Sequence, residues 1–239
     1  MTIRRRTHIY DGPGGPFEGV VAWDDAATGP RPGVMIVPNV LGQKEFDTMK
    51  AEALAALGYV GFACDTYGRG RRTTRESPDP AIYMNELAAD RALLRDRLHA
   101  SVAALHALPE VDVTRTAAIG YCFGGKSVID LARSGGDVLG VVSFHGIYDP
   151  PPYDNVSPIA AKLLICHGWD DPLAPPDSVV ALGEEMTAAG ADWQLHAFGD
   201  TGHAFTDPSA PARPGFGYNP DSDRRSWAAM RDFLGELFA

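Results

Sequence analysis

Short runs of apolar residues alternate along the chain with longer segments in which apolar residues recur at helical spacing. This alternation is typical of a parallel sheet covered by helices, and it predicts the α/β class. The predicted strands are Val34 to Val37, Tyr59 to Cys64, Ala117 to Tyr121, Val138 to Phe144, Leu163 to His167 and Trp193 to Phe198. The predicted helices are Phe46 to Leu57, about Ile82 to Leu108, Lys126 to Arg133, Val179 to Ala189 and Trp227 to Phe238. A turn at Gly12 to Pro16 predicts two antiparallel edge strands before them.

The composition fits one globular domain over residues 1–239. Apolar residues make up 45% of the 239 residues and charged residues 22%, which is ordinary globular usage. A net charge of −10 disfavours nucleic acid and membrane surfaces as partners. No apolar run has the length of a membrane span, and three cysteines without a secretion signal predict unpaired thiols, so we expect a cytoplasmic protein. The sequence carries no signal of the oligomeric state.

One cysteine stands in a setting suited to nucleophilic chemistry. Cys122 is the centre of Gly120-Tyr121-Cys122-Phe123-Gly124-Gly125, between a predicted strand and a predicted helix, which fits a nucleophile elbow. Such a turn requires small neighbours, and the helix N-terminus stabilises a thiolate and a developing oxyanion. The alternative is a small buried core residue, which is our interpretation for Cys64 and Cys166.

A cysteine nucleophile needs a base and a group that orients the base. In this fold both follow the nucleophile along the chain, in the order acid, then histidine. Asp170 and Asp171 follow one strand and His203 follows the next, at the sheet edge where open α/β sheets bind ligands. Turn formation is the alternative for either aspartate, and helix capping or solvent exposure for His203. His145, His167 and His196 belong to strands or strand ends, and we assign them no role.

Metal-ligand spacings of histidine or paired cysteine are not present in the sequence. We therefore expect no metal and no cofactor.

With these motifs in place, the chain resembles the dienelactone hydrolase family from about Val34 to its C-terminus. The resemblance implies a compact α/β-hydrolase domain without a lid domain, a Cys-His-Asp triad, and lactone opening through a covalent acyl-enzyme. The segment His167 to Asp171 matches the family's acid motif with Asp171 in the catalytic place, and Gly202 to Phe205 matches its histidine loop. The implied triad is Cys122, Asp171 and His203.

The same resemblance implies further site residues. The oxyanion donors are the backbone N–H groups of Val40 and Phe123. The segment Asp65 to Arg69 matches an arginine-bearing loop, so Arg69 is a candidate for contact with a substrate carboxylate, with a solvated loop arginine as the alternative. Asn39 stands where the family has a glutamate that partners the cysteine, and it is a second candidate for substrate contact.

Asn39 and one further position depart from the family pattern. Asn39 does not take the thiol proton as a carboxylate does. A second family arginine is expected shortly after the histidine, but Thr206 and Asp207 stand there. Because Asp207 would repel an anionic substrate if it faced the pocket, we expect a substrate with less negative charge than the family's carboxylated dienelactone.

Two functions therefore compete. The first is a cysteine-dependent carboxylic ester hydrolase for a small ester or lactone. The second is a catalytically silent domain that binds a small molecule or a partner, because a fold does not fix a function. A thiol redox sensor is a third possibility, but the sequence has no neighbouring resolving cysteine.

Overall fold

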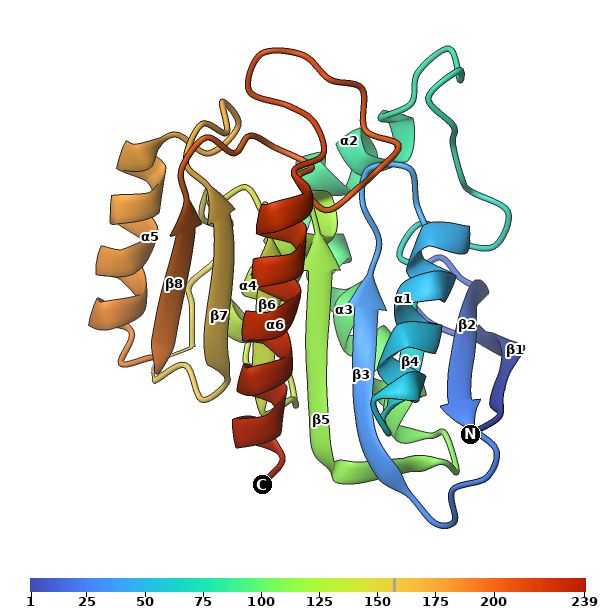
Figure 1. The fold of residues 1–239 in the computed structure, drawn as a ribbon. Coiled ribbons are helices and arrows are strands. Elements are labelled where there is room, and N and C mark those ends of the chain that lie inside the picture. Colours follow the sequence, from blue (N-terminus) through green and yellow to red (C-terminus); the bar gives the residue numbers. More distant parts are fainter. Residues whose placement is uncertain (157) are drawn as a thin grey trace.

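A computed structural model describes residues 1–156 and 158–239 (Figure 1). Its strands are β1 Ile3–Tyr10, β2 Phe17–Asp24, β3 Arg31–Val37, β4 Val60–Ala63, β5 Val111–Tyr121, β6 Gly140–Phe144, β7 Lys162–Gly168 and β8 Trp193–Phe198. Its helices are α1 Glu45–Ala56, α2 Ile82–Ala89, α3 Arg91–His106, α4 Phe123–Arg133, α5 Pro176–Ala188 and α6 Pro220–Leu237. The predicted alternation of strands and helices is confirmed.

All eight strands form one sheet in the order β1-β2-β4-β3-β5-β6-β7-β8. Strands β1, β2 and β4 pair antiparallel, and the strands from β4 to β8 are parallel. The chain passes from β3 to β4 on one side and then to β5 on the other side of β3. The C-terminal ends of β3 and β5 therefore flank the point where the order reverses, which is where such sheets bind ligands.

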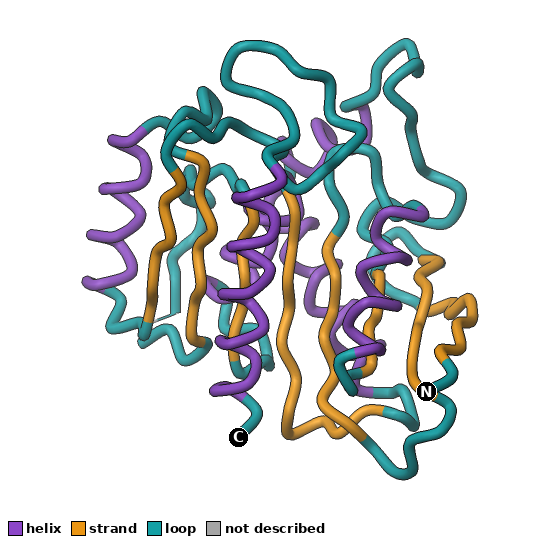
Figure 2. Tube along the Cα trace, in the orientation of Figure 1, coloured by secondary structure: helices purple, strands orange, loops and turns teal. Residues whose placement is uncertain are grey.

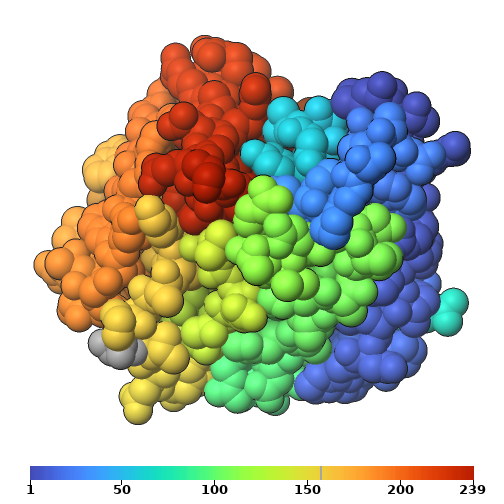
Figure 3. All heavy atoms as spheres, turned by 90° about the horizontal axis from the view of Figure 1, so that it is seen from below, coloured from blue at the N-terminus to red at the C-terminus, as the bar shows by residue number. Residues whose placement is uncertain are grey.

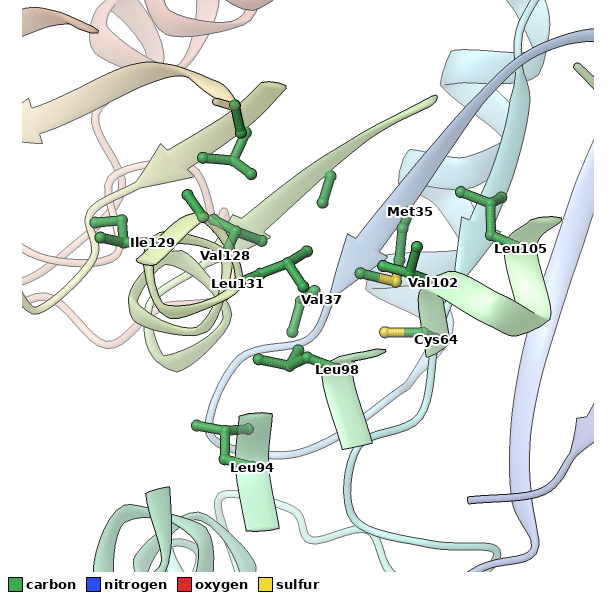
Figure 4. Packing of buried hydrophobic residues seen from close by; sticks show 14 of the residues in the cluster. Met35, Val37, Cys64, Leu94, Leu98, Val102, Leu105, Val128, Ile129 and Leu131 are labelled. Carbon is green, nitrogen blue, oxygen red and sulfur yellow. The ribbon is translucent and has the colours of Figure 1, made fainter. Parts of the chain in front are cut away.

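Two apolar cores cover the two faces of the sheet. The strand β3 shows why, because its successive side chains point to opposite faces: Met35 and Val37 belong to one core, and Val34 and Ile36 to the other. Helices α2 to α5 bury the first core and helices α1 and α6 the second. In Figure 4, apolar side chains of α3 and α4 lie against Met35 and Val37.

Two predicted helices differ most from the structure. The single helix expected from about Ile82 to Leu108 is divided at Asp90 into α2 and α3, because the Asp90 carboxylate accepts a hydrogen bond from Leu93 N (2.9 Å) and caps α3. The last helix begins at Pro220, before the expected Trp227. Asn219 caps it by accepting from Ser222 N (3.1 Å), and proline is favoured in a first helical turn.

Buried ion pairs join the helix α4 to the helices α3 and α5. The side chains of Arg133 and Asp130 are both fully buried and pair at 3.2 Å. Arg133 also pairs with Glu185 of α5 (2.6 Å), and Arg91 of α3 pairs with Asp130. A buried charge that loses its partner is strongly destabilising, so these contacts hold α4 in one place relative to α3 and α5.

The loops that follow the parallel strands gather at one end of the molecule, above the strand ends in Figure 2. Figure 3 shows the opposite end, where these strands begin and where the C-terminal residues lie beside residues of the middle of the chain. Within residues 1–156 and 158–239, no helix is both long enough and apolar enough to cross a membrane.

The start of α4 is packed against the end of β3 with no room for a side chain. A Cβ atom on Gly124 would lie 2.1 Å from the carbonyl oxygen of Val37, and a Cβ atom on Gly120 would lie 2.1 Å from that of Gly124. Both contacts are far shorter than any real Cβ contact. Glycine at these two positions allows the turn between β5 and α4 to be this sharp.

We expect Gly124→Ala to lower the free energy of unfolding by about 3 kcal/mol or more, because two backbone segments must separate to admit the methyl group. Gly235→Ala in α6 is the matched control. A Cβ atom there meets no neighbour within 4 Å, so helix propensity should raise stability by up to about 1 kcal/mol. Urea unfolding followed by circular dichroism measures both, and equal stability of the two variants would contradict the packing argument.

Candidate active site

Cys122 occupies the sharp turn between β5 and α4. Its backbone has φ 57° and ψ −114°, a conformation that non-glycine residues rarely adopt. Such outliers persist only where the surrounding structure enforces them, and they cluster at functional sites. The turn places Cys122 at the N-cap of α4, half-buried at the C-terminal edge of the sheet.

His203 and Asp171 come together at the same edge. The His203 Nδ1 atom lies 2.7 Å from the Asp171 Oδ2 atom, and both side chains are buried. The other Asp171 oxygen accepts a hydrogen bond from Leu173 N (2.8 Å). His203 is also held through its backbone, which donates to Gly215 O (2.7 Å) and accepts from Gly217 N (3.0 Å). The loop therefore presents His203 in one orientation.

Asp171 occupies Nδ1 and leaves Nε2 for Cys122. The His203 Nε2 atom is buried and has no hydrogen-bond partner among the described residues. Cys122 and His203 line the same cavity. A histidine whose Nδ1 is held by a carboxylate and whose Nε2 is free beside a cysteine has the arrangement that a general base requires.

The electrostatics of the two side chains are those of an ion pair. Burial raises the pKa of the Cys122 thiol, but the charge of His203 and the backbone N–H groups of Phe123 and Val40 outweigh burial, so the pKa is lowered. Burial likewise lowers the pKa of His203, but Cys122 and Asp171 outweigh it and raise the pKa to about 10. The thiolate and imidazolium therefore stabilise each other. The N–H groups of Phe123 and Val40, which the resemblance implies as oxyanion donors, lie beside the sulfur.

The two candidates for substrate contact, Asn39 and Arg69, make other contacts. The Asn39 side chain accepts from Leu41 N (2.9 Å) and so shapes the loop that carries Val40. The Arg69 side chain is exposed and pairs with Glu18 (3.0 Å). Neither residue is part of the described cavity wall.

The cavity has a volume of about 230 Å³ and a mostly apolar wall. It is lined by Val40, Leu41, Arg75, Met84, Cys122, Ile147, Leu173, His203, Ala204, Ala210, Pro211, Arg213 and Phe216. Such a volume suits a small substrate.

Two arginines that carried no assignment from the sequence, Arg75 and Arg213, belong to the cavity wall. Arg75 pairs with Asp207 at 2.6 Å, and Arg213 stacks on the Phe216 ring at 3.9 Å. Asp207 is thus nearly buried and directed at Arg75, so the repulsion of an anion expected from it is offset by a positive charge. Sequence spacing gave no signal for this pairing, because 132 residues separate the partners.

The fold is that of an α/β-hydrolase, with Cys122 in a sharp turn between a strand and a helix. The model of the dienelactone hydrolase family matches residues 17–238, and the chain belongs to that family. It is a hydrolase of the kind that acts on esters or lactones.

Three known proteins illustrate the similarity. A crystal structure named dienelactone hydrolase-like promiscuous phosphotriesterase P91, from metagenomic libraries, is 35% identical, covers 99% of each chain and has a TM-score of 0.94. An uncharacterized protein of Caenorhabditis elegans is 36% identical over 61% of this chain and 95% of its own. A relative from Yersinia pestis, provisionally named carboxymethylenebutenolidase, is 26% identical over 90% of this chain and 81% of its own.

We expect iodoacetamide at neutral pH to modify Cys122 and to spare Cys64 and Cys166, whose thiols are fully buried with raised pKa values. Since the thiolate is the reactive form and His203 lowers the pKa of Cys122, the alkylation rate should rise at a lower pH than for an ordinary thiol. His203→Gln should move that midpoint upward. Peptide mass spectrometry against pH measures this, and an unmoved midpoint in the variant would contradict the ion pair.

Proposed function

We propose that this protein hydrolyses a small ester or lactone through a covalent acyl-enzyme on Cys122. The observation that carries the proposal is the convergence of a strained cysteine at a helix N-terminus with a histidine whose other nitrogen is held by a buried carboxylate. His203 acts as base and acid, and Asp171 orients it. The backbone N–H groups of Val40 and Phe123 stabilise the oxyanion.

In the first half of the reaction, the Cys122 thiolate attacks the carbonyl carbon, and the π electrons of the carbonyl move onto its oxygen. The tetrahedral intermediate collapses, the bond to the leaving oxygen breaks, and that oxygen takes the proton from the His203 imidazolium. An ester releases its alcohol at this point. A lactone ring opens, and its alcohol stays attached to the acyl group.

In the second half, neutral His203 removes a proton from water as the water oxygen attacks the thioester carbon. The carbon–sulfur bond then breaks, the acid leaves, and Cys122 returns to the thiolate beside the His203 imidazolium. No further residue is required to move a proton, since the one accepted from water restores the starting charge on His203.

The lining of the cavity favours a substrate with little negative charge. Its wall is mostly apolar, and one of its two guanidinium groups, that of Arg75, is neutralised by Asp207. A structural relative is named as a promiscuous phosphotriesterase, so a neutral phosphotriester belongs in the substrate panel beside short esters and lactones.

The competing function is a silent domain that binds a ligand in the same cavity. We expect the protein to release nitrophenol from a short nitrophenyl ester, with an acyl adduct trapped on Cys122 and detected by mass spectrometry. Cys122→Ala should lose at least about a thousandfold in kcat, and His203→Ala most of the turnover with the fold retained. Full activity in Cys122→Ala, or an adduct on Cys64 or Cys166, would contradict the mechanism. Binding without turnover would identify the silent domain.

A second test concerns substrate charge. Asp207→Asn removes the partner of Arg75, so we expect kcat/KM for a carboxylated ester to rise about ten- to a hundredfold relative to its neutral analogue, the value of a charge-assisted hydrogen bond of about 1.5–3 kcal/mol. The control is Asp170→Asn, at the exposed neighbour of Asp171, which should leave the ratio of the two kcat/KM values unchanged. A wild-type preference for the carboxylated ester that Arg69→Ala abolishes would show instead that Arg69 binds the anion.

A further inference from the structure

His145 is a buried histidine beside the proposed triad that the reaction steps above do not use. It follows β6 directly, and β6 lies between β5, which carries Cys122, and β7. Its side chain is 2% exposed and is not part of the cavity wall. Its backbone has φ 40°, another rare conformation for a residue with a side chain.

Both ring nitrogens of His145 are engaged. The Nδ1 atom accepts a hydrogen bond from the backbone N–H of Cys122 at 3.1 Å, and the same N–H lies 3.0 Å from Phe144 O. The Nε2 atom lies 2.8 Å from the Thr206 hydroxyl. Because Nδ1 accepts, the network assigns the proton of the neutral ring to Nε2, which donates to Thr206.

These two hydrogen bonds join two separate parts of the site. Cys122 belongs to the turn after β5, and Thr206 belongs to the loop after β8 that carries His203 three residues earlier. The His145 ring also packs edge-on against the His203 ring, with centroids 5.1 Å apart, and against the Phe205 ring at the same distance. His145 thus contacts the nucleophile's backbone and the base's ring together.

The bridge requires a neutral ring. Burial, first, and then the positive charges of His203 and Lys50 lower the pKa of His145 well below its usual range, although the residue's own backbone acts in the opposite direction. A proton on Nδ1 would place a donor against the Cys122 N–H group and a second cation beside the His203 imidazolium. Either contact would separate the two parts that His145 joins.

We propose that His145 is a positioning residue that, by bridging the Cys122 backbone and the Thr206 hydroxyl, fixes the nucleophile turn and the His203 loop relative to each other. The proposal rests on the proposed function, since it acts through Cys122 and His203. His145 does not line the cavity, so its removal changes kcat and leaves KM nearly unchanged. A misplacement of about 1 Å between reacting groups costs up to a hundredfold in rate.

The experiment removes each end of the bridge in turn. Thr206→Val deletes the hydroxyl with little change of shape, and Thr206→Ser keeps it. His145→Leu deletes both ring nitrogens, whereas His145→Asn keeps an acceptor for the Cys122 N–H group and tolerates a positive φ but has no group at the Nε2 position to contact Thr206. The control is His106→Leu, because His106 Nε2 makes a similar bond to Thr116 Oγ1 (3.1 Å) about 20 Å along β5 from Cys122.

We expect Thr206→Val and His145→Leu to lower kcat about ten- to a hundredfold with KM changed less than about threefold. Their Cys122 alkylation midpoint should move to higher pH, because a displaced His203 stabilises the thiolate less. Thr206→Ser and His106→Leu should keep most of the wild-type kcat and midpoint, whereas His145→Asn, which keeps only the Cys122 end of the bridge, should lose kcat as Thr206→Val does. If His145→Leu does not fold, the Thr206 pair decides the question alone.

Unchanged kcat and midpoint in folded Thr206→Val would overturn the proposal, as would an equal loss in His106→Leu. A failure of the proposed function has a different signature, because Cys122→Ala would then keep its activity and no acyl adduct would form on the wild-type protein.

Discussion

The site depends on the close contact between the start of α4 and the end of β3. Because Gly120 and Gly124 have no side chain, the chain can turn sharply at Cys122. The backbone of Cys122 is strained as a result. The turn aims the sulfur at the sheet edge and brings the first N–H group of α4 beside it. The same contact places the loop after β3, with Val40, beside the sulfur.

Electrostatic interactions hold the rest of the site around this turn. Arg133 and Asp130 of α4 carry charges that are buried and paired, and they hold the helix in place. At the sheet edge, Asp171 raises the pKa of His203, and His203 in turn lowers the pKa of Cys122. Because the cavity is small and mostly apolar, these charges are screened little by water and interact strongly.

Much of the fold was predictable, because strands and helices follow from local periodicity. Boundaries were missed where one polar side chain ended or began a helix, as at Asp90 and Asn219. The side chains of the proposed triad were expected at one edge, since parallel strands deliver their following residues there, but only the family resemblance selected Asp171 over Asp170. His145 follows a strand at that edge as well, so the same rule could have included it.

The sequence by itself determined the alternating α/β pattern and the chain order of the proposed nucleophile, acid and histidine, because both follow from spacing along the chain. Only the tertiary structure decided which charges meet. It paired Arg75 with Asp207 and left Arg69 at the surface with Glu18. It also brought His145 between Cys122 and Thr206. These contacts join residues 23 to 132 positions apart, and their distances depend on how the sheet and loops pack in three dimensions.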